Sequence, residues 1–450
     1  MKIIQVHPSG WGFREQGGGA SFTPWGCNYY DPATGWPPQI WTRFDPGRVR
    51  AHFTRIRAIG GNVIRVFASV ARLLDSPTRV NRAGLAKMER MLALAEAAGL
   101  RVIWSGPGAW EGTPPWWRES TPYEGYARPD LVRAQATAWR GLAAAMRGHP
   151  ALLAYELHNE PFAPWQDSPA LRAAWRRWRP RHAPRAPATP PCPVPPLNQN
   201  WTPDFQRFRE RLALDYVARM TAAIRAGDDT HLLTIGLHQK SAPFDWYPPD
   251  PYAAFNAHQL APLLDYTSIH FYPHHLFHPS LYRDPYESRA AMAETFLHAR
   301  AVARYVRTPG QPVVMEECGW YSGTDVLTAN RELSAGSEAK QTAWCRGLVA
   351  ATRGDVCGWL FWPYRDTPSS LDTSRSSGFY DARGRLKDWG RAFARLAPAI
   401  TRRIPERAVG TVRLRADVRQ LTTQPAAVKR CRAAYVAAFR RGQTVDFARR

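Results

Sequence analysis

Two acidic residues follow apolar segments, where their carboxyl groups could transfer a proton or attack a carbon atom. Glu160 lies in the segment Leu152–Phe162, LLAYELHNEPF, and Glu317 lies in Pro312–Trp320, PVVMEECGW. Cleavage of a glycosidic bond needs such a pair: one acid protonates the leaving oxygen, and the other carboxylate attacks or activates water. Either acid alone could be an ordinary surface residue, but the pair in this order favours glycoside chemistry.

Strand alternation predicts which of the nearby acids share a face. Along Pro312–Glu317 it places Glu317 toward the active-site side and leaves Glu316 to pair with arginine or backbone elsewhere, although a β-bulge could reverse this. On the other segment it turns Glu156 and His158 to the same side as Glu160. A buried Glu156 requires a partner, and Arg65 is the candidate that we expect.

The elements that must position these acids alternate between short apolar runs and longer helical patterns, from Trp25 to about Ile400. This rhythm is typical of repeated βα units and predicts an α/β fold, a (β/α)8 TIM barrel. A carboxylate at the C-terminal end of a strand then lies where barrel active sites form. The predicted strands are Gly26–Tyr29, Val63–Ala68, Leu100–Ser105, Leu152–His158, Leu232–Leu237, Tyr266–Tyr272, Pro312–Glu317 and Cys357–Trp362.

Helical patterns separate most of these strands. The unit between strands five and six, 240–264, gives only a weak helix signal because it is rich in proline, aspartate and aromatic residues. The predicted helices are Pro46–Ile59, Gly84–Ala98, Asp130–Arg147, Asp204–Ala226, Ser288–Val306 and Glu338–Arg353.

Two segments fall outside this rhythm. Residues 162–203 form a proline- and arginine-rich insertion after strand four, which we expect to be an extended excursion on the rim of the site or a solvated linker. We assign residues 1–400 to the catalytic domain. The basic tail, 401–450, has a β–α–β pattern that cannot bury both faces of its strands alone, so it either packs on the barrel or begins a second domain.

Composition excludes several other classes of protein. The chain has 450 residues, 44% hydrophobic, with 19 tryptophans, which excludes a disordered chain. The net charge of +23 comes mostly from scattered arginines, without a nucleic-acid-binding motif, so we expect no nucleic-acid partner. The six cysteines show no metal-ligand spacing, and neither a signal peptide nor a membrane-spanning stretch is evident. We therefore expect no metal, no membrane and a cytoplasmic protein, or a secreted one if a signal was removed.

In these motifs the chain resembles clan A glycoside hydrolases, closest to the family 5 cellulase and mannanase group. The resemblance extends from about Phe22 to Ile400. The resemblance implies that Glu160 in Asn159-Glu160-Pro161 is the acid/base and that Asn159 binds the sugar 2-hydroxyl. It implies that Glu317 is the nucleophile, although Cys318 replaces the usual aromatic residue.

Further matches carry the resemblance on other strands. Arg65 in NVIRVF would hold the nucleophile ionised, Tyr272 in SIHFYPHH would orient it, and Trp362 in GWLFWPYRD would form a floor for the sugar ring. His270 and Asn28 complete the expected substrate-binding residues.

The chain also departs from the family pattern. The histidine often found on strand three is absent from RVIWSGPGAWEG, so its contact is missing or is supplied by Trp104, Ser105 or Trp110. The opening WGCNYYDPATGWPPQIW is more like the β-mannosidase-type branches of the clan, which suggests a short site that trims chain ends.

These features predict a retaining β-glycoside hydrolase acting on a β-linked glucoside or mannoside, without a cofactor. Two alternatives stay open: a non-catalytic carbohydrate-binding barrel, and a transglycosylase that shields the same covalent intermediate from water. A β-linked oligosaccharide or glycoside is the expected partner, and the oligomeric state is unknown.

Overall fold

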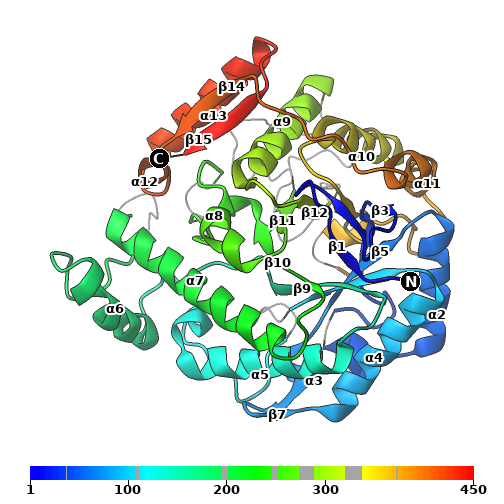
Figure 1. The fold of residues 1–450 in the computed structure, drawn as a ribbon, viewed down its shortest axis with the longest axis horizontal. Coiled ribbons are helices and arrows are strands. Elements are labelled where there is room, and N and C mark those ends of the chain that lie inside the picture. Colours follow the sequence, from blue (N-terminus) through cyan, green and yellow to red (C-terminus); the bar gives the residue numbers. More distant parts are fainter. Residues whose placement is uncertain are drawn as a thin grey trace.

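The protein is a closed barrel of eight parallel strands surrounded by helices (Figure 1). The computed structural model describes residues 1–36, 38–106, 112–193, 201–245, 251–272, 288–319, 337–370 and 373–449. Neighbouring strands follow the order of the sequence, and the last strand pairs with the first. The predicted (β/α)8 barrel is therefore confirmed. Its strands are β4 (Trp25–Tyr29), β5 (Val63–Phe67), β8 (Arg101–Ser105), β9 (Leu152–Asn159), β10 (Leu232–His238), β11 (Thr267–Phe271), β12 (Val313–Cys318) and β13 (Trp359–Phe361).

The helices between the strands agree with the six predicted ones to within two residues at each end. The fifth βα unit has a helix of only four residues, α8 (Ala257–Leu260), which explains its weak signal. A helix that we did not predict, α11 (Asp388–Thr401), follows the last strand. The long helices before it are α2 (Pro46–Ala58), α4 (Arg82–Ala97), α5 (Pro129–Met146), α7 (Pro203–Arg225), α9 (Arg289–Val306) and α10 (Glu338–Thr352).

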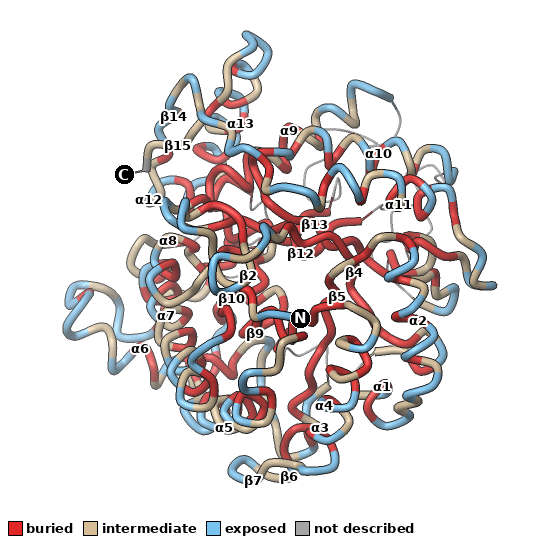
Figure 2. Tube along the Cα trace, turned by 45° about the vertical axis from the view of Figure 1, so that its right-hand side comes forward, coloured by how far each residue is buried: buried red, intermediate tan, exposed pale blue. Residues whose placement is uncertain are grey.

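The barrel strands are buried along nearly their whole length, as Figure 2 shows in red. Helices cover the outer face of a parallel sheet, so its strands become continuous apolar runs rather than alternating ones. A small sheet of β1 (Ile4–Val6), β2 (Phe13–Glu15) and β3 (Ser21–Phe22) contacts Arg101, the first residue of β8, through Glu15 and Phe22. There the Phe13 ring meets the edge of Tyr266 at 5.3 Å. This sheet covers the end of the barrel opposite Glu160 and Glu317.

The insertion after strand four is not extended throughout, so that prediction is wrong for its first half. Helix α6 (Pro169–His182) occupies this part and lies outside α7 (Figure 1). Trp175 of α6 is fully buried and packs against Phe205 and Phe208, with ring centroids 6.2 and 5.2 Å away. Leu171, Ala174 and Trp175 form one apolar face at helical spacing, a signal hidden by the proline-rich sequence that follows.

The C-terminal tail contains the predicted strand, helix and strand. These are β14 (Val412–Ala416), α13 (Pro425–Arg440) and β15 (Val445–Arg449), and the two strands pair in parallel. The tail packs on the barrel beside α9, where Phe447 stacks on Phe244 at 5.3 Å and Arg304 binds Asp446 at 2.9 Å. None of the described helices is long and apolar enough to span a bilayer.

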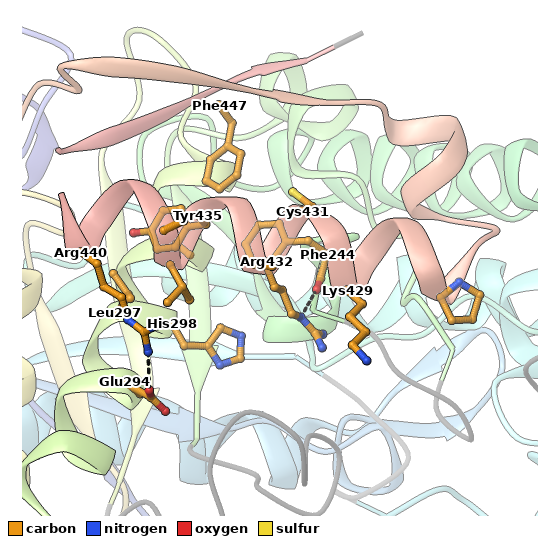
Figure 3. Close-up of a pocket in the computed structure, with 15 residues that line it drawn as sticks. Phe244, Glu294, Leu297, His298, Lys429, Cys431, Arg432, Tyr435, Arg440 and Phe447 are labelled. Carbon is orange, nitrogen blue, oxygen red and sulfur yellow. Dashed lines mark hydrogen bonds and ion pairs between the residues drawn. The ribbon is translucent and has the colours of Figure 1, made fainter.

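A cavity of about 660 Å³ remains between α13 and α9 (Figure 3). Apolar side chains such as Leu297, Tyr435 and Phe447 line it, with Lys429 and Arg440 at its rim. None of its lining residues is Glu160, Glu317 or one of their hydrogen-bond partners.

Candidate active site

Arg65 lies at the centre of the carboxyl groups at the C-terminal end of the barrel. Its Nε and Nη2 donate to the two oxygens of Glu156 at 2.5 Å each, and its Nη1 contacts Glu317. The side chain is fully buried. A buried arginine is tolerated here because the neighbouring carboxylates compensate its charge. Burial raises the pKa of Glu156, but Arg65 outweighs this effect and holds that pKa at about 2. The structure therefore contains the predicted Arg65–Glu156 pair.

The terminal nitrogens of Arg65 also lie within hydrogen-bond distance of three polar side chains on neighbouring strands. The acceptors are Asn28 Oδ1 at 2.8 Å, Asn159 Oδ1 at 2.7 Å and Ser105 Oγ at 2.9 Å. The hydroxyl of Ser105 in turn donates to Glu156 at 2.8 Å. Both predicted asparagines thus belong to the cluster.

Three residues were candidates to supply the contact of the absent histidine on strand three. Of the two that the structure describes, Ser105 is the one that reaches the cluster. Trp104 is fully buried and packs against Trp41, with ring centroids 5.8 Å apart. Trp110 lies outside the described residues. A serine thus supplies a contact to Arg65 and Glu156 from the end of β8.

Glu317 lies near the end of β12 with hydrogen-bond donors on both of its oxygens. Tyr272 donates its hydroxyl to Oε2 at 3.0 Å, and Arg65 contacts Oε1. Burial raises the pKa of Glu317 above its ordinary value, and the nearby charge of Arg65 offsets this only in part. Hydrogen bonds to both oxygens therefore fix the orientation of this carboxylate from two sides.

Glu160 directly follows β9 and keeps 23% of its side chain exposed. Its backbone has a φ of 46°, and its amide donates to the carbonyl of Gly236 at 2.9 Å. Its Oε1 lies 3.1 Å from His270 Nδ1. Loss of hydration raises the pKa of Glu160 to about 7, so this carboxyl group can hold a proton at neutral pH and release it.

His270 lies between the two glutamates. Its Nδ1 is 3.1 Å from Glu160 and 3.6 Å from Glu317. Burial lowers the pKa of His270 to about 4, so the ring is neutral at pH 7. One ligand atom from each of these three residues lies within 4.8 Å of the others, the one such grouping among the described residues that a cation could join.

Gly236 on β10 permits the close approach of these groups. A Cβ atom there would lie 2.4 Å from Glu156 Oε1 and 2.8 Å from His270 Nε2. Both distances are shorter than real contacts allow, so any side chain at this position would displace the carboxylate or the imidazole. Sequence reasoning missed this residue.

The prediction for Glu316 is wrong. The ladder between β11 and β12 changes register after Ile269. Ile269 pairs with Met315, but the next residue, His270, pairs with Glu317. This β-bulge leaves Glu316 as the extra residue, and its carboxylate accepts a hydrogen bond from the Tyr266 hydroxyl at 2.5 Å. Glu316 therefore lies inside the barrel with the cluster and not beside an outer arginine.

A second irregularity, on β9, overturns the prediction for His158. The ladder with β10 shifts between Thr234, opposite Glu156, and Gly236, opposite Asn159. As a result His158 packs against Tyr126 and Tyr216, away from Glu156, with ring centroids 5.5 and 6.1 Å apart. Asn159 takes its place in the cluster.

Trp362 follows β13 and is only 3% exposed. Trp36 stacks on it with centroids 4.9 Å apart, and the Trp362 indole donates to Ser374 Oγ at 2.8 Å. Trp36, which sequence reasoning did not select, is the more exposed of the two rings. It lies in the loop after β4. The available signal was an apolar residue in a loop at the barrel end where the carboxyl groups lie.

Gln239 and Lys240, directly after β10, were also missed. Gln239 Oε1 accepts a hydrogen bond from the backbone amide of Tyr272 at 2.9 Å. The charge of Lys240 lowers the pKa of Glu160, against the larger effect of burial. Their position at a strand end could have identified them.

Solved structures with this fold include glycosidases. A GH5_18 protein from Streptomyces cattleya, in complex with Manb1-4GlcNAc, is 21% identical with a TM-score of 0.70, covering 95% of this chain and 94% of that one. The exo-beta-1,4-mannosidase of Opitutaceae bacterium strain TAV5 is 19% identical with a TM-score of 0.68, covering 100% and 72%. No match was found among curated proteins. These likenesses concern the fold.

The family itself is shown by the sequence. The model of the cellulase family, glycosyl hydrolase family 5, matches residues 34–366, which is most of the chain. That range contains β5 to β13 and all the strand-end carboxyl groups described above. The protein is therefore a member of glycosyl hydrolase family 5.

Proposed function

We propose that the protein is a retaining β-glycoside hydrolase that uses Glu160 as acid/base and Glu317 as nucleophile. The observation that carries this proposal is the closeness of the two carboxyl groups, with one oxygen of each within 4.8 Å. Retaining enzymes keep their carboxyl groups about 5–5.5 Å apart, whereas inverting enzymes need room for a water molecule.

The surroundings of the two acids match these roles. Glu317 accepts hydrogen bonds from Arg65 and Tyr272, which keep it ionised and aimed. In the first step it attacks the anomeric carbon while Glu160, with a pKa of about 7, gives its proton to the leaving oxygen. In the second step the oxygen of a water molecule attacks the anomeric carbon while Glu160 takes a proton from that water, and the bond between the sugar and Glu317 breaks.

The other predicted residues would bind the sugar. Asn159 uses Oδ1 to accept from Arg65, which leaves its amide nitrogen for the 2-hydroxyl of the sugar. The stacked pair Trp36 and Trp362 offers an aromatic wall beside the acids. No cofactor is needed, because the two carboxyl groups complete the reaction.

For the substrate we propose a β-linked mannoside ahead of a glucoside. Two of the structural neighbours are described as a complex with Manb1-4GlcNAc and as an exo-beta-1,4-mannosidase. The test is a panel of aryl β-mannoside, β-glucoside and β-galactoside, together with Manβ1-4GlcNAc. Phenol release from the mannoside and a first product of retained configuration are expected. A carbohydrate-binding protein would release no phenol, and a transglycosylase would transfer the sugar to an added acceptor.

A further inference from the structure

Glu316 is a second carboxyl group inside the barrel, next to Glu317 in sequence but in different surroundings. It is fully buried, and its Oε1 accepts a hydrogen bond from Tyr266. Its Oε2 is also buried and has no hydrogen-bond donor among the described residues. Glu156, however, lies within hydrogen-bonding reach. Two ionised carboxylates are both acceptors, so they can bond only if one of them carries a proton.

The charges around Arg65 decide where that proton lies. Glu156, Glu316 and Glu317 surround one buried guanidinium, and His270 is neutral at pH 7. Three ionised carboxylates would leave two buried negative charges without a partner, which is costly. Glu156 receives two bonds from Arg65 and one from Ser105, so it is the better anion. Burial and the charge of Glu156 raise the pKa of Glu316 well above its usual range.

We propose that Glu316 is a positioning residue that stays protonated at neutral pH and donates a hydrogen bond from Oε2 to Glu156. Tyr266, directly before β11, fixes the other end of the carboxylic acid. Glu156 is thereby held against Arg65, which in turn contacts Glu317. The catalytic consequence rests on the proposed function, but the protonation does not.

The discriminating variant is Glu316→Gln, because an amide preserves both hydrogen bonds of a protonated acid. Its oxygen accepts from Tyr266 and its nitrogen donates to Glu156. We expect kcat within a few-fold of wild type and unchanged limbs in the pH profile of kcat/KM. Glu316→Leu removes both bonds, so Arg65 and Glu317 lose alignment and kcat should fall on the order of 100-fold.

An ionised Glu316 gives the opposite pattern. Glu316→Gln would then remove a negative charge beside Glu317 and shift the acidic limb to lower pH, because Glu317 would ionise more easily. That shift, or a loss in Glu316→Gln as large as that in Glu317→Gln, overturns the proposal.

The protonation of Glu316 can be measured directly, without a substrate and without the leucine variant. Infrared difference spectra of wild type minus Glu316→Gln at about pH 9, above the pKa of about 7 of Glu160, should contain the band of one protonated carboxyl group. Absence of that band overturns the proposal. If the band is present in a wild-type protein that cleaves no glycoside, the proposed function fails while the protonation stands.

Glu210 provides a matched control. It is a buried glutamate on α7 that also accepts a hydrogen bond from a tyrosine, Tyr252, at 3.0 Å, but it lies outside the cluster. Glu210→Gln and Glu210→Leu should leave kcat per folded molecule unchanged. A leucine effect confined to position 316 then reflects the cluster and not the loss of any buried acid.

Discussion

The carboxyl cluster and the C-terminal tail use arginine in opposite ways. Arg65 is fully buried and binds carboxylates of Glu156 and Glu317 and three further side chains. On β14, Arg413 and Arg415 are exposed and alternate with partly buried Val412 and Leu414. A buried arginine needs partners for its charge on every side, while an exposed one is hydrated and contributes little to stability. The positive charge of the chain is therefore no guide to where its chemistry lies.

The largest contrast is expected for Glu317→Ala. Activity should fall by orders of magnitude because the nucleophile is lost, and azide should restore it by entering the space left by the carboxylate. The product to detect is a glycosyl azide whose configuration is inverted relative to the substrate. Azide rescue of Glu316→Ala instead, or a first wild-type product of inverted configuration, would show that the nucleophile is misassigned.

Glu160 should set the alkaline limb of the pH profile. Its raised pKa of about 7 means that the proton needed for the leaving group is present below pH 7 and lost above it. Activity should also fall at acidic pH, as Glu317 becomes protonated. In Glu160→Gln, measured with a substrate whose leaving group needs protonation, the alkaline limb should disappear. An unchanged limb would contradict the acid/base role.

Arg65→Met tests stability in the same cluster. It leaves Glu156 and Glu317 buried without their cation, which costs about 3–5 kcal/mol of unfolding free energy. Chemical denaturation at pH 7 is the measurement. The loss should shrink at low pH, where the uncompensated carboxyl groups take up protons. An equal loss at both pH values would indicate a packing effect alone.

The smallest effect is expected from the tail. Deletion of the residues beyond Arg402 should leave turnover per folded molecule largely intact, because the described residues of this segment, 403–449, make no hydrogen bond or ion pair with the carboxyl cluster. The melting temperature should fall, since the contacts of Phe447 with Phe244 and Tyr305 are lost. The double variant Arg413→Gln/Arg415→Gln should change neither quantity. A near-total loss of turnover in soluble, folded, truncated protein would refute this separation.

Most of the barrel could be predicted from the sequence, because buried parallel strands are continuous apolar runs and their helices have regular apolar faces. Strand ends then indicated Glu160 and Glu317, while the need of a buried Glu156 for a partner and the family resemblance indicated Arg65. The side chain directions of His158 and Glu316 could not be predicted, because alternation assumes a regular ladder and each lies at a register shift.

Other features depend on contacts between distant segments. Gly236 matters only because Glu156 and His270 approach it from β9 and β11, and nothing in its own strand indicates this. In α6 the apolar face was readable, but the proline-rich sequence after it concealed the helix.

The contacts of Arg65 also bear on the order in which the chain can become active. Its partners come from β4, β8, β9 and β12, so they are separated by up to 289 positions between Asn28 and Glu317. The segment through β9, which is made first during synthesis, already contains Arg65 and Glu156. The nucleophile arrives only with β12, near the end of the barrel. A chain that stops before β12 therefore contains the cation but lacks the carboxylate of Glu317 that it contacts, so the cluster is complete only when the barrel is nearly whole.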